Sequence, residues 1–311
     1  MSAAPQPVSR ILVIRLGALG DFVQSFGPFQ AIRAAHPQAH ITLLTTQPFV
    51  ELAQLSPWFD QVLVDARSPW RDLKGLLALR QQLRGYDRVY DLQTSSRTAR
   101  YFVLAGRPKG WCGHVAATPL SHANPWRNDM HTRARQRDQL RMAGLAEVPL
   151  PDVSWLAGKG PDVAGPYAVL VPGAAPHRPA KRWPARRYGH LARKLVAQGI
   201  TPLIAGTGAD TPLAQQIRQI CPQAQDYTGR TSLPELAGLL ARATVAIGND
   251  TGPMHLAALM GCRCVVLFSG QSNPALTSPL GRVPGQVCVF SVPDLALLGV
   301  DRVAAALCWR H

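Results

Sequence analysis

Short apolar runs alternate along the first half of the chain with segments whose apolar residues recur every three or four positions. The first run, ILVIRLGALGD, is broken by glycines and is followed by a helical pattern that includes Phe26 and Ile32. Later apolar runs predict strands and the periodic segments between them predict helices. The expected strands after the first are 41–46, 62–65 and 88–93, and the expected helices are 26–35, 48–56 and 72–84.

The second half repeats this alternation of strand and helix. The expected strands are 167–174, 201–206, 244–250 and 262–270, and the expected helices are 186–198, 212–220, 234–241 and a helix from Gly252 onward. Strands that alternate with helices are typical of a parallel, doubly wound α/β sheet. The chain therefore predicts two Rossmann-like halves.

Length and composition favour two domains. A chain of 311 residues exceeds what one hydrophobic core usually supports, and the stretch 146–166 is rich in proline and glycine. We place the boundary near residue 158, which gives an N-terminal domain of 1–158 and a C-terminal domain of 159–311. Two facing sheets would place a ligand in a cleft between them, beyond the carboxyl ends of their strands. A terminal helix over 294–309 has the length to pack back on the first domain.

The charge of the chain points to an anionic partner. The net charge is +15, carried mainly by arginine, and both halves are basic. The densest run lies between Arg97 and Arg141, with nine basic and two acidic residues. A solvated face is the common fate of such runs. The chain has no aromatic stacking pattern, zinc knuckle or recognition helix, so we favour phosphorylated small molecules and an anionic membrane surface over nucleic acid.

Cysteine usage and hydropathy indicate a cytoplasmic protein. The six cysteines form no CxxC pair and no disulfide framework, so we expect reduced packing residues. The polar start lacks the apolar core of a signal peptide, and no run of 18 apolar residues occurs.

The stretch GNDTGPMHLAALMG, residues 248–261, carries the most specific pattern in the chain. We expect a helix to begin at Thr251 or Gly252, with Asp250 near its cap. The amino end of a helix presents free amides and a positive dipole, which suit a diphosphate. Thr251 adds a hydroxyl, Gly252 permits close approach, and His255 shares the same end. The alternative is that Asp250 only caps the helix and His255 is an ordinary half-buried histidine.

The glycine loop RLGALGD places a carboxylate at a helix start. Gly17 and Gly20 alone make a weak dinucleotide fingerprint. Asp21 follows at the beginning of the helix, where a carboxylate repels phosphate but suits a general base. On these residues alone, a helix cap is the more common explanation.

Two further loops follow strands of the second half. Residues 171–192 gather Lys181, Arg182, Arg186 and Arg187 at a loop and helix start, so some of these cations should bind an anionic ligand. A solvated helix face fits Arg186 and Arg187 better than it fits Lys181. In the loop AGTGAD, Asp210 is as consistent with ribose binding as with a helix cap.

Together, ILVIRLGALGD, the KRWP segment and NDTGPMHLAALMG resemble glycosyltransferase family 9, the ADP-heptose:lipopolysaccharide heptosyltransferases. The resemblance implies a GT-B fold and inverting, metal-independent transfer of a heptose from an ADP-sugar, without a cofactor. It implies catalytic roles for Asp21 and Lys181. It assigns the donor to these residues: Asp250, Thr251, Gly252, His255, Asp210 and Thr231.

On the acceptor side we expect Gly20, Arg97 and Arg100 to face the lipid A and inner-core acceptor at the inner face of the membrane. Two other functions compete with this interpretation. A tandem-Rossmann NAD(P)-dependent oxidoreductase would need a true GxGxxG with a later acidic residue, which neither half provides clearly. A non-catalytic nucleotide- or lipid-binding relative would gain nothing from Asp21.

Overall fold

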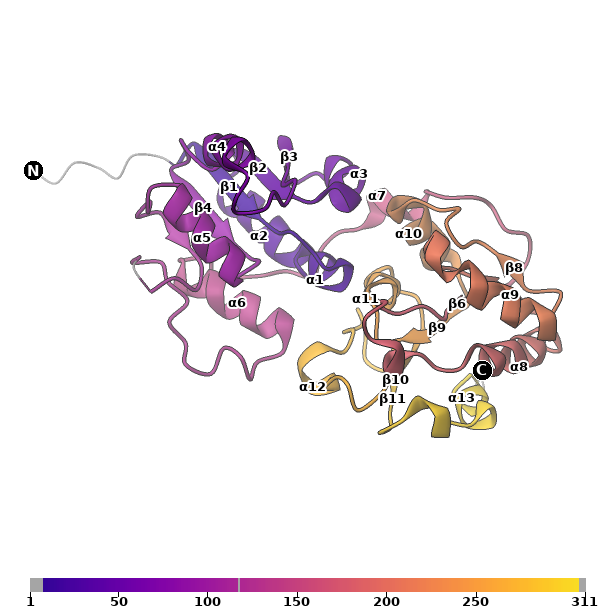
Figure 1. Cartoon of the computed structure of the whole chain (residues 1–311). Helices are drawn as coiled ribbons and strands as arrows, with labels where there is room; N and C mark the ends of the chain where they lie inside the picture. The colour runs from indigo at the N-terminus through magenta and orange to yellow at the C-terminus, as the bar shows by residue number, and fades with distance from the viewer. Residues whose placement is uncertain (1–7, 117, 308–311) are drawn as a thin grey trace, which may run out of the picture. The chain divides into compact units, whose positions relative to one another are not determined.

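A computed structural model describes residues 8–116 and 118–307, which divide between Pro151 and Asp152 into two compact units, unit 1 and unit 2 (Figure 1). The division falls before the expected boundary at 158. The reason is that the short helix α7 (Ser154–Ala157) packs on α10 (Leu233–Arg242) of the second unit. Arg242 also donates hydrogen bonds to the carbonyls of Ala157 and Lys159, at 2.9 and 3.1 Å.

Unit 1 is built on a parallel five-stranded sheet in the order β3-β2-β1-β4-β5. β1 lies in the centre, and its four apolar residues, Ile11 to Ile14, are buried, whereas Arg10 at its start is exposed. The strands are β1 (Arg10–Ile14), β2 (His40–Thr45), β3 (Gln61–Val64), β4 (Arg88–Asp91) and β5 (Trp111–Cys112).

Helices connect the strands of unit 1 and cover its sheet. Leu79 and Leu83 near the end of α4, with Tyr101 and Phe102 of α5, share one buried cluster with β1, β2, β4 and β5, so α4 and α5 cover the same side of the sheet. The helices are α1 (Leu19–Gln24), α2 (Phe26–Ala35), the 3₁₀ turn η1 (Gln47–Phe49), α3 (Val50–Gln54), α4 (Leu73–Gln82), α5 (Ser96–Leu104) and α6 (Thr132–Met142).

Unit 2 repeats the design with six parallel strands in the order β11-β10-β9-β6-β7-β8. Its strands are β6 (Tyr167–Val171), β7 (Thr201–Ile204), β8 (Gln225–Asp226), β9 (Val245–Asn249), β10 (Cys264–Phe268) and β11 (Val287–Ser291). Its other helical elements are η2 (Pro179–Lys181), α8 (Ala185–Val196), η3 (Gly208–Asp210), α9 (Thr211–Ile220), α11 (Gly252–Leu259), α12 (Pro274–Thr277), η4 (Leu295–Leu297) and α13 (Val300–Ala305).

The predicted alternation is confirmed. β2 and β3 have the predicted lengths but start one residue earlier, whereas β4, β6, β7, β9 and β10 are shorter than predicted. β4 ends at Asp91 because the Asp91 carboxylate accepts hydrogen bonds from the Gln93 and Thr94 amides, which turns the chain. The terminal helix expected over 294–309 is instead η4 and α13, and α13 packs on α8 within unit 2. The end of that prediction, residues 308–309, lies outside the described residues. The elements α5, α6, β5, β8 and β11 were not predicted.

Four of the cysteines, Cys112, Cys221, Cys262 and Cys264, are free and buried, as expected. Cys288 is free but exposed, because it lies on the edge strand β11, so the expectation of a packing residue was wrong there. Cys308 lies outside the described residues. Among residues 8–116 and 118–307, no helix combines the length and apolarity needed to cross a membrane.

Candidate active site

In unit 2 the chain leaves β9 and enters α11 through Asn249, Asp250 and Thr251. α11 begins at Gly252, as expected, with Pro253 in its first turn. Thr251 is the N-cap and makes no side-chain hydrogen bond to that turn; its hydroxyl donates to the Asn249 carbonyl at 3.2 Å. The positive end of the helix dipole therefore has no capping side chain at this position.

Asp250 does not cap α11, which corrects the simpler of the two explanations for this residue. Its Oδ2 accepts a hydrogen bond from Lys181 Nζ at 2.5 Å and another from Ser272 Oγ at 2.7 Å. The Lys181 and Asp250 side chains are 12% and 8% exposed. The pair therefore joins the loop after β6 to the loops after β9 and β10, and it holds the ammonium group beside the start of α11.

Asn249 anchors the KRWP segment to the same place. Asn249 is fully buried, and its Oδ1 accepts hydrogen bonds from the Trp183 amide at 2.9 Å and the Tyr188 hydroxyl at 3.1 Å. Its Nδ2 donates to the carbonyls of Pro172 and Gly173, at 2.8 and 3.2 Å. No role of Asn249 was predicted from the sequence. A polar residue at the end of a fully apolar strand was the signal available.

The arginines that follow Lys181 in the sequence make different contacts. Arg182 donates to the Ala174 carbonyl at 3.0 Å, and Arg187 donates to the Leu298 carbonyl. The expectation of a solvated face was therefore wrong for Arg187. Arg186 is exposed, which fits that expectation.

His255 lies in the first half of α11 and is 7% exposed, between the buried Met254 and Leu256. Thr251, Gly252 and His255 therefore belong to one helix start, as the pattern predicted.

Asp210 and Thr231 lie on neighbouring loops at the same edge of the sheet. Asp210 accepts hydrogen bonds from the amide and the hydroxyl of Thr207, both at 2.9 Å, and so closes a capping box. The Gly229 amide, two residues before Thr231, donates to the Gly206 carbonyl at 2.9 Å. A Cβ at Gly173 would lie 2.6 Å from Asp210 Oδ1, so glycine is needed where this carboxyl meets the β6 loop.

In unit 1 the glycine loop brings Asp21 beside a buried arginine. Gly17 has a φ of +121°, and a Cβ there would lie 2.8 Å from the ring of Phe49, so the turn requires glycine. Gly20 is buried in α1. Asp21 lies in the first turn of α1, whose N-cap is Ala18, and its Oδ1 is 3.3 Å from Arg15 Nη2.

Arg15 was not predicted as part of this site. Its side chain is 4% exposed while that of Asp21 is 43% exposed, so the carboxylate meets solvent and the guanidinium supports it from within. Arg15 also donates to the carbonyls of Asp21, at 3.2 Å, and Leu92. Burial lowers the pKa of Arg15, and the nearby Asp21 charge opposes that shift. An arginine directly after a buried strand was the sequence signal.

Asp91 is a second carboxyl group at this edge of the sheet. It pairs in register with Ile14 and is completely buried. Its Oδ1 accepts the Gln93 and Thr94 amides at 3.1 and 3.0 Å, while its Oδ2 has no hydrogen-bond partner. Burial raises the pKa of Asp91 to about 6, because the lost solvation outweighs those hydrogen bonds and the Arg15 charge.

Comparison with models of known protein families assigns the chain to one of them. The sequence model described as glycosyltransferase family 9 (heptosyltransferase) matches residues 76–296. The chain belongs to glycosyltransferase family 9. The match contains Lys181, Asp210, Thr231 and the whole α11 segment, whereas Asp21 precedes it.

Individual relatives of this family 9 chain extend the similarity. The lipooligosaccharide heptosyltransferase 2 of Haemophilus ducreyi is 24% identical over 323 residues, covering 94% of this chain and 91% of that protein. The enzyme of that name from Haemophilus influenzae is 36% identical over 120 residues, which span 37% of this chain and only 34% of the relative.

The structure of the E. coli heptosyltransferase WaaC with ADP matches with a TM-score of 0.77 at 20% identity, over 96% of this chain and 98% of that one. The family 9 chain therefore has the GT-B fold class of two Rossmann-like units. Family membership makes the chain a glycosyltransferase. It therefore excludes the two alternative functions, an oxidoreductase and a non-catalytic binding protein.

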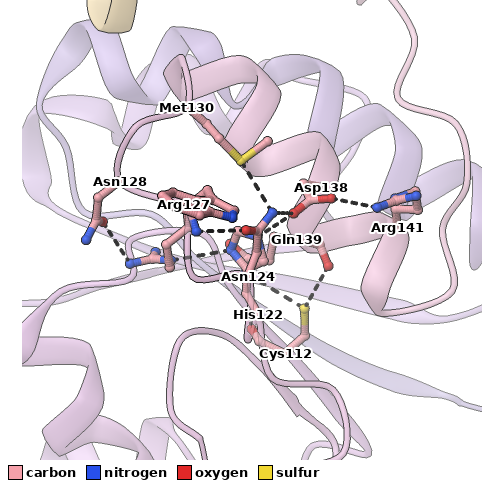
Figure 2. Close-up of polar contacts among 10 residues, drawn as sticks. Cys112, His122, Asn124, Arg127, Asn128, Met130, Asp138, Gln139 and Arg141 are labelled. Carbon is pink, nitrogen blue, oxygen red and sulfur yellow. Dashed lines mark hydrogen bonds and ion pairs between the residues drawn. The ribbon is translucent and has the colours of Figure 1, made fainter.

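The basic segment of this family 9 glycosyltransferase is not one solvated face. Figure 2 shows that part of it forms an internal network, in which Asp138 accepts hydrogen bonds from His122, Asn124 and Arg141 at 2.9, 2.7 and 2.9 Å. Hydrogen bonds from Asn124 and His122 lower the pKa of Asp138 to about 2. Arg127 Nε donates to His122 Nδ1 at 3.5 Å, so His122 Nε2 carries the proton shared with Asp138.

Arg97 and Arg100 lie apart from that network, on α5. Their guanidinium carbons lie 5.2 and 4.8 Å from the centre of the Trp70 ring. Arg97 also donates to the Tyr101 hydroxyl at 3.1 Å, and that hydroxyl donates to Asp65 at 2.5 Å. The two arginines predicted to face the acceptor therefore share one aromatic platform, with Arg100 exposed and Arg97 partly exposed.

Proposed function

We propose that this family 9 glycosyltransferase transfers a heptose from an ADP-sugar to the inner core of a lipopolysaccharide, with inversion at the anomeric carbon. Its relatives carry the names of lipooligosaccharide and lipopolysaccharide heptosyltransferases, and the WaaC structure was solved with ADP. The observation that carries the proposal is the arrangement of Lys181, Asp250 and Ser272 beside the uncapped start of α11.

The donor diphosphate is proposed to bind at that helix start. Asp250 accepts one hydrogen bond from Lys181 Nζ, and an ammonium group has three donors, so others remain for a phosphate oxygen. The first-turn amides add donors that are already oriented. The Thr251 hydroxyl adds one more when it turns from the Asn249 carbonyl to the phosphate. As the glycosidic bond to the diphosphate breaks, these groups stabilise the negative charge that develops on ADP. His255 completes this donor site, and the loops of Asp210 and Thr231 hold the ribose and the adenine.

Asp21 is proposed as the general base. It removes the proton from an acceptor hydroxyl, whose oxygen attacks the anomeric carbon from the side opposite the leaving diphosphate. One displacement inverts the stereocentre. Arg15 fixes the Asp21 carboxylate through the 3.3 Å contact. Gly20, directly before it, is buried in α1, so no direct contact with the acceptor is assigned to it.

The acceptor is proposed to be lipid A that carries inner-core sugars, bound at the inner face of the cytoplasmic membrane. Arg97 and Arg100 are the candidates for contact with its phosphates, because guanidinium groups bind phosphate through two parallel hydrogen bonds. The protein would then act in the cytoplasm as a peripheral membrane enzyme.

Product analysis tests this function. The purified chain is incubated with ADP-heptose and a series of defined inner-core acceptors, and the products are analysed by mass spectrometry and NMR. The expected product carries one added heptose with inverted anomeric configuration, while ADP-glucose and UDP-glucose serve as competing donors. Transfer from another donor in preference to ADP-heptose would refute the donor assignment.

A further inference from the structure

Helix α4 carries apolar side chains on its outer face as well as on its inner one. Leu79 and Leu83 are buried against the sheet, whereas Leu73 and Leu77 are 73% and 61% exposed. Arg80 and Arg84 are exposed as well. Leu77 and Arg80 lie four and seven positions after Leu73, which places these three residues on one stripe of α4. Arg84 follows the C-cap Leu83, just beyond the end of the helix. The outer face of α4 is therefore two leucines and an arginine, with a second exposed arginine directly after the helix.

Helix α5 continues this surface on the same side of the sheet. Val103 is 54% exposed, and the exposed Arg100 lies three positions earlier on the same face. Arg100 stacks on Trp70, which lies just before α4, with its guanidinium carbon 4.8 Å from the ring centre. We define the α4–α5 face as Leu73, Leu77, Arg80, Arg84, Arg100 and Val103.

The charge around the α4–α5 face is almost entirely positive. Residues 66–110 contain ten lysines and arginines and three aspartates. Each aspartate is already engaged: Asp72 caps α4 by accepting from the Gly75 amide, Asp87 accepts from the Ser9 and Arg10 amides, and Asp91 is buried. These hydrogen bonds hold Asp72 and Asp87 in place without removing their charge, and the ten cations outnumber the three carboxyl groups.

We propose that the α4–α5 face docks on an anionic phospholipid bilayer. Leu73, Leu77 and Val103 enter the boundary between headgroups and acyl chains, and the arginines contact lipid phosphates. Exposed leucines flanked by cations are typical of surfaces that lie on membranes. A second copy of the chain fits less well, because it would bring two positive faces together. The inference rests on the proposed function in that a lipid-linked acceptor places the enzyme at a bilayer.

The inference differs from the sequence-based hypothesis, which gave the membrane contact to the whole run from Arg97 to Arg141. In the 122–141 part of that run, Figure 2 shows His122, Asn124, Arg127, Asp138 and Arg141 in one network, in which His122 and Asp138 are buried. Arg137 and Arg141 are exposed. The α4–α5 face instead includes Leu73 and Leu77, which precede that run in the sequence.

Vesicle sedimentation tests the proposal with the full chain. Wild type is expected to bind vesicles of phosphatidylglycerol and phosphatidylethanolamine, more weakly as NaCl rises, and not to bind phosphatidylcholine. L73S/L77S should lower the partition coefficient at least about tenfold. The variant loses the free energy gained when two leucine side chains leave water, which corresponds to at least that factor in an equilibrium constant. L297S is the matched control, because Leu297 is 75% exposed in unit 2, and it should bind like wild type.

R80A/R84A should weaken the salt-sensitive part of binding, while R218A, which removes an exposed arginine of α9, should not.

The proposal would be overturned if wild type did not bind anionic vesicles, or if L73S/L77S bound them like wild type. Sedimentation velocity tests the other occupant: a dimer that L73S/L77S dissociates would assign the face to a second copy and also overturn it.

Transfer assays separate this inference from the proposed function. With a water-soluble acceptor that lacks acyl chains, L73S/L77S should match wild type, which also shows that the variant folds. With the lipid-linked acceptor in vesicles, the variant should be slower by about the factor lost in binding. Failure of wild type to use either acceptor would defeat the proposed function, whereas equal rates of variant and wild type on the vesicle acceptor would defeat the docking proposal.

Discussion

At the scale of single residues, two carboxyl groups at the edge of the unit 1 sheet have different environments and therefore different properties. Asp21 is 43% exposed beside the Arg15 guanidinium, which suits a group that must meet a substrate. Asp91 is buried with one oxygen unpartnered, and its pKa is raised to about 6. Only the first has the access that a general base needs.

Replacing the proposed base should reduce turnover without loss of structure. Asp21→Asn keeps the size of the side chain but removes its basicity, so we expect a loss of about 10² to 10⁴-fold in kcat. ADP affinity, measured by calorimetry, should stay close to wild type. Asp129→Asn alters an exposed aspartate of unit 1 and should be neutral. Near-normal turnover in folded Asp21→Asn would contradict the role of Asp21.

Asp91 should make the stability of unit 1 depend on pH. Its native pKa of about 6 exceeds the ordinary 3.8, so the native state binds more protons between these values. Stability therefore falls as pH rises from about 4 to about 6, by about 3 kcal/mol, and is level above. Asp91→Asn should remove this fall, which urea unfolding across that range would measure relative to wild type. Parallel pH curves for variant and wild type would contradict it.

At the scale of elements, the start of α11 is organised by contacts from loops distant in sequence. Asn249 fixes the KRWP segment, and Asp250 pairs with Lys181 and Ser272. The helix sequence alone predicted an anion site. The position of the ammonium group depended on how β6, β9 and β10 lie side by side, which only the folded sheet determines.

Lys181→Ala should weaken ADP binding and also destabilise unit 2. The change removes a donor proposed for phosphate and leaves the largely buried Asp250 without its cation, which typically costs about 3 kcal/mol. Lys194→Ala is the matched control, because the Lys194–Asp301 pair spans 2.9 Å between exposed side chains and contributes about 0–1 kcal/mol. Calorimetric ADP titration and urea unfolding measure both effects. Unchanged ADP affinity in Lys181→Ala would exclude it from the donor site.

At the scale of the whole molecule, the chain has two units, each with its own parallel sheet and its own buried core. The donor residues proposed above all lie in unit 2, and the proposed base lies in unit 1. A nucleotide that binds native unit 2 should therefore stabilise that unit first.

Calorimetry with ADP tests whether the donor nucleotide binds to unit 2. We expect two unfolding transitions, and ADP at about 100 times its Kd should stabilise the transition of unit 2 by about 2.7 kcal/mol. Trp126→Phe and Trp155→Phe, one exposed or partly exposed tryptophan in each unit, help to assign the transitions by fluorescence. A shift confined to unit 1 would contradict the assignment of the donor site.

The sequence by itself determined the parallel α/β architecture, the two halves and the helix start after β9. Each depends on local pattern: β1, β9 and β10 contain uninterrupted apolar runs of four or five residues. Gly252 and Pro253 follow the run of β9 closely and favour a helix start there. The helix α6 escaped prediction because its buried residues include Gln136, Asp138 and Gln139, which no hydrophobic pattern reveals.

Only the tertiary structure decided which groups meet. The pairing of Arg15 with Asp21, the raised pKa of Asp91, and the contact of Lys181 with Asp250 all depend on burial and on neighbours from other strands. The outward direction of Leu73 and Leu77 was equally hidden, because a leucine in a helical pattern is normally taken as core. Burial and charge pairing are properties of the folded arrangement, so a linear pattern can name candidate residues but not their environments.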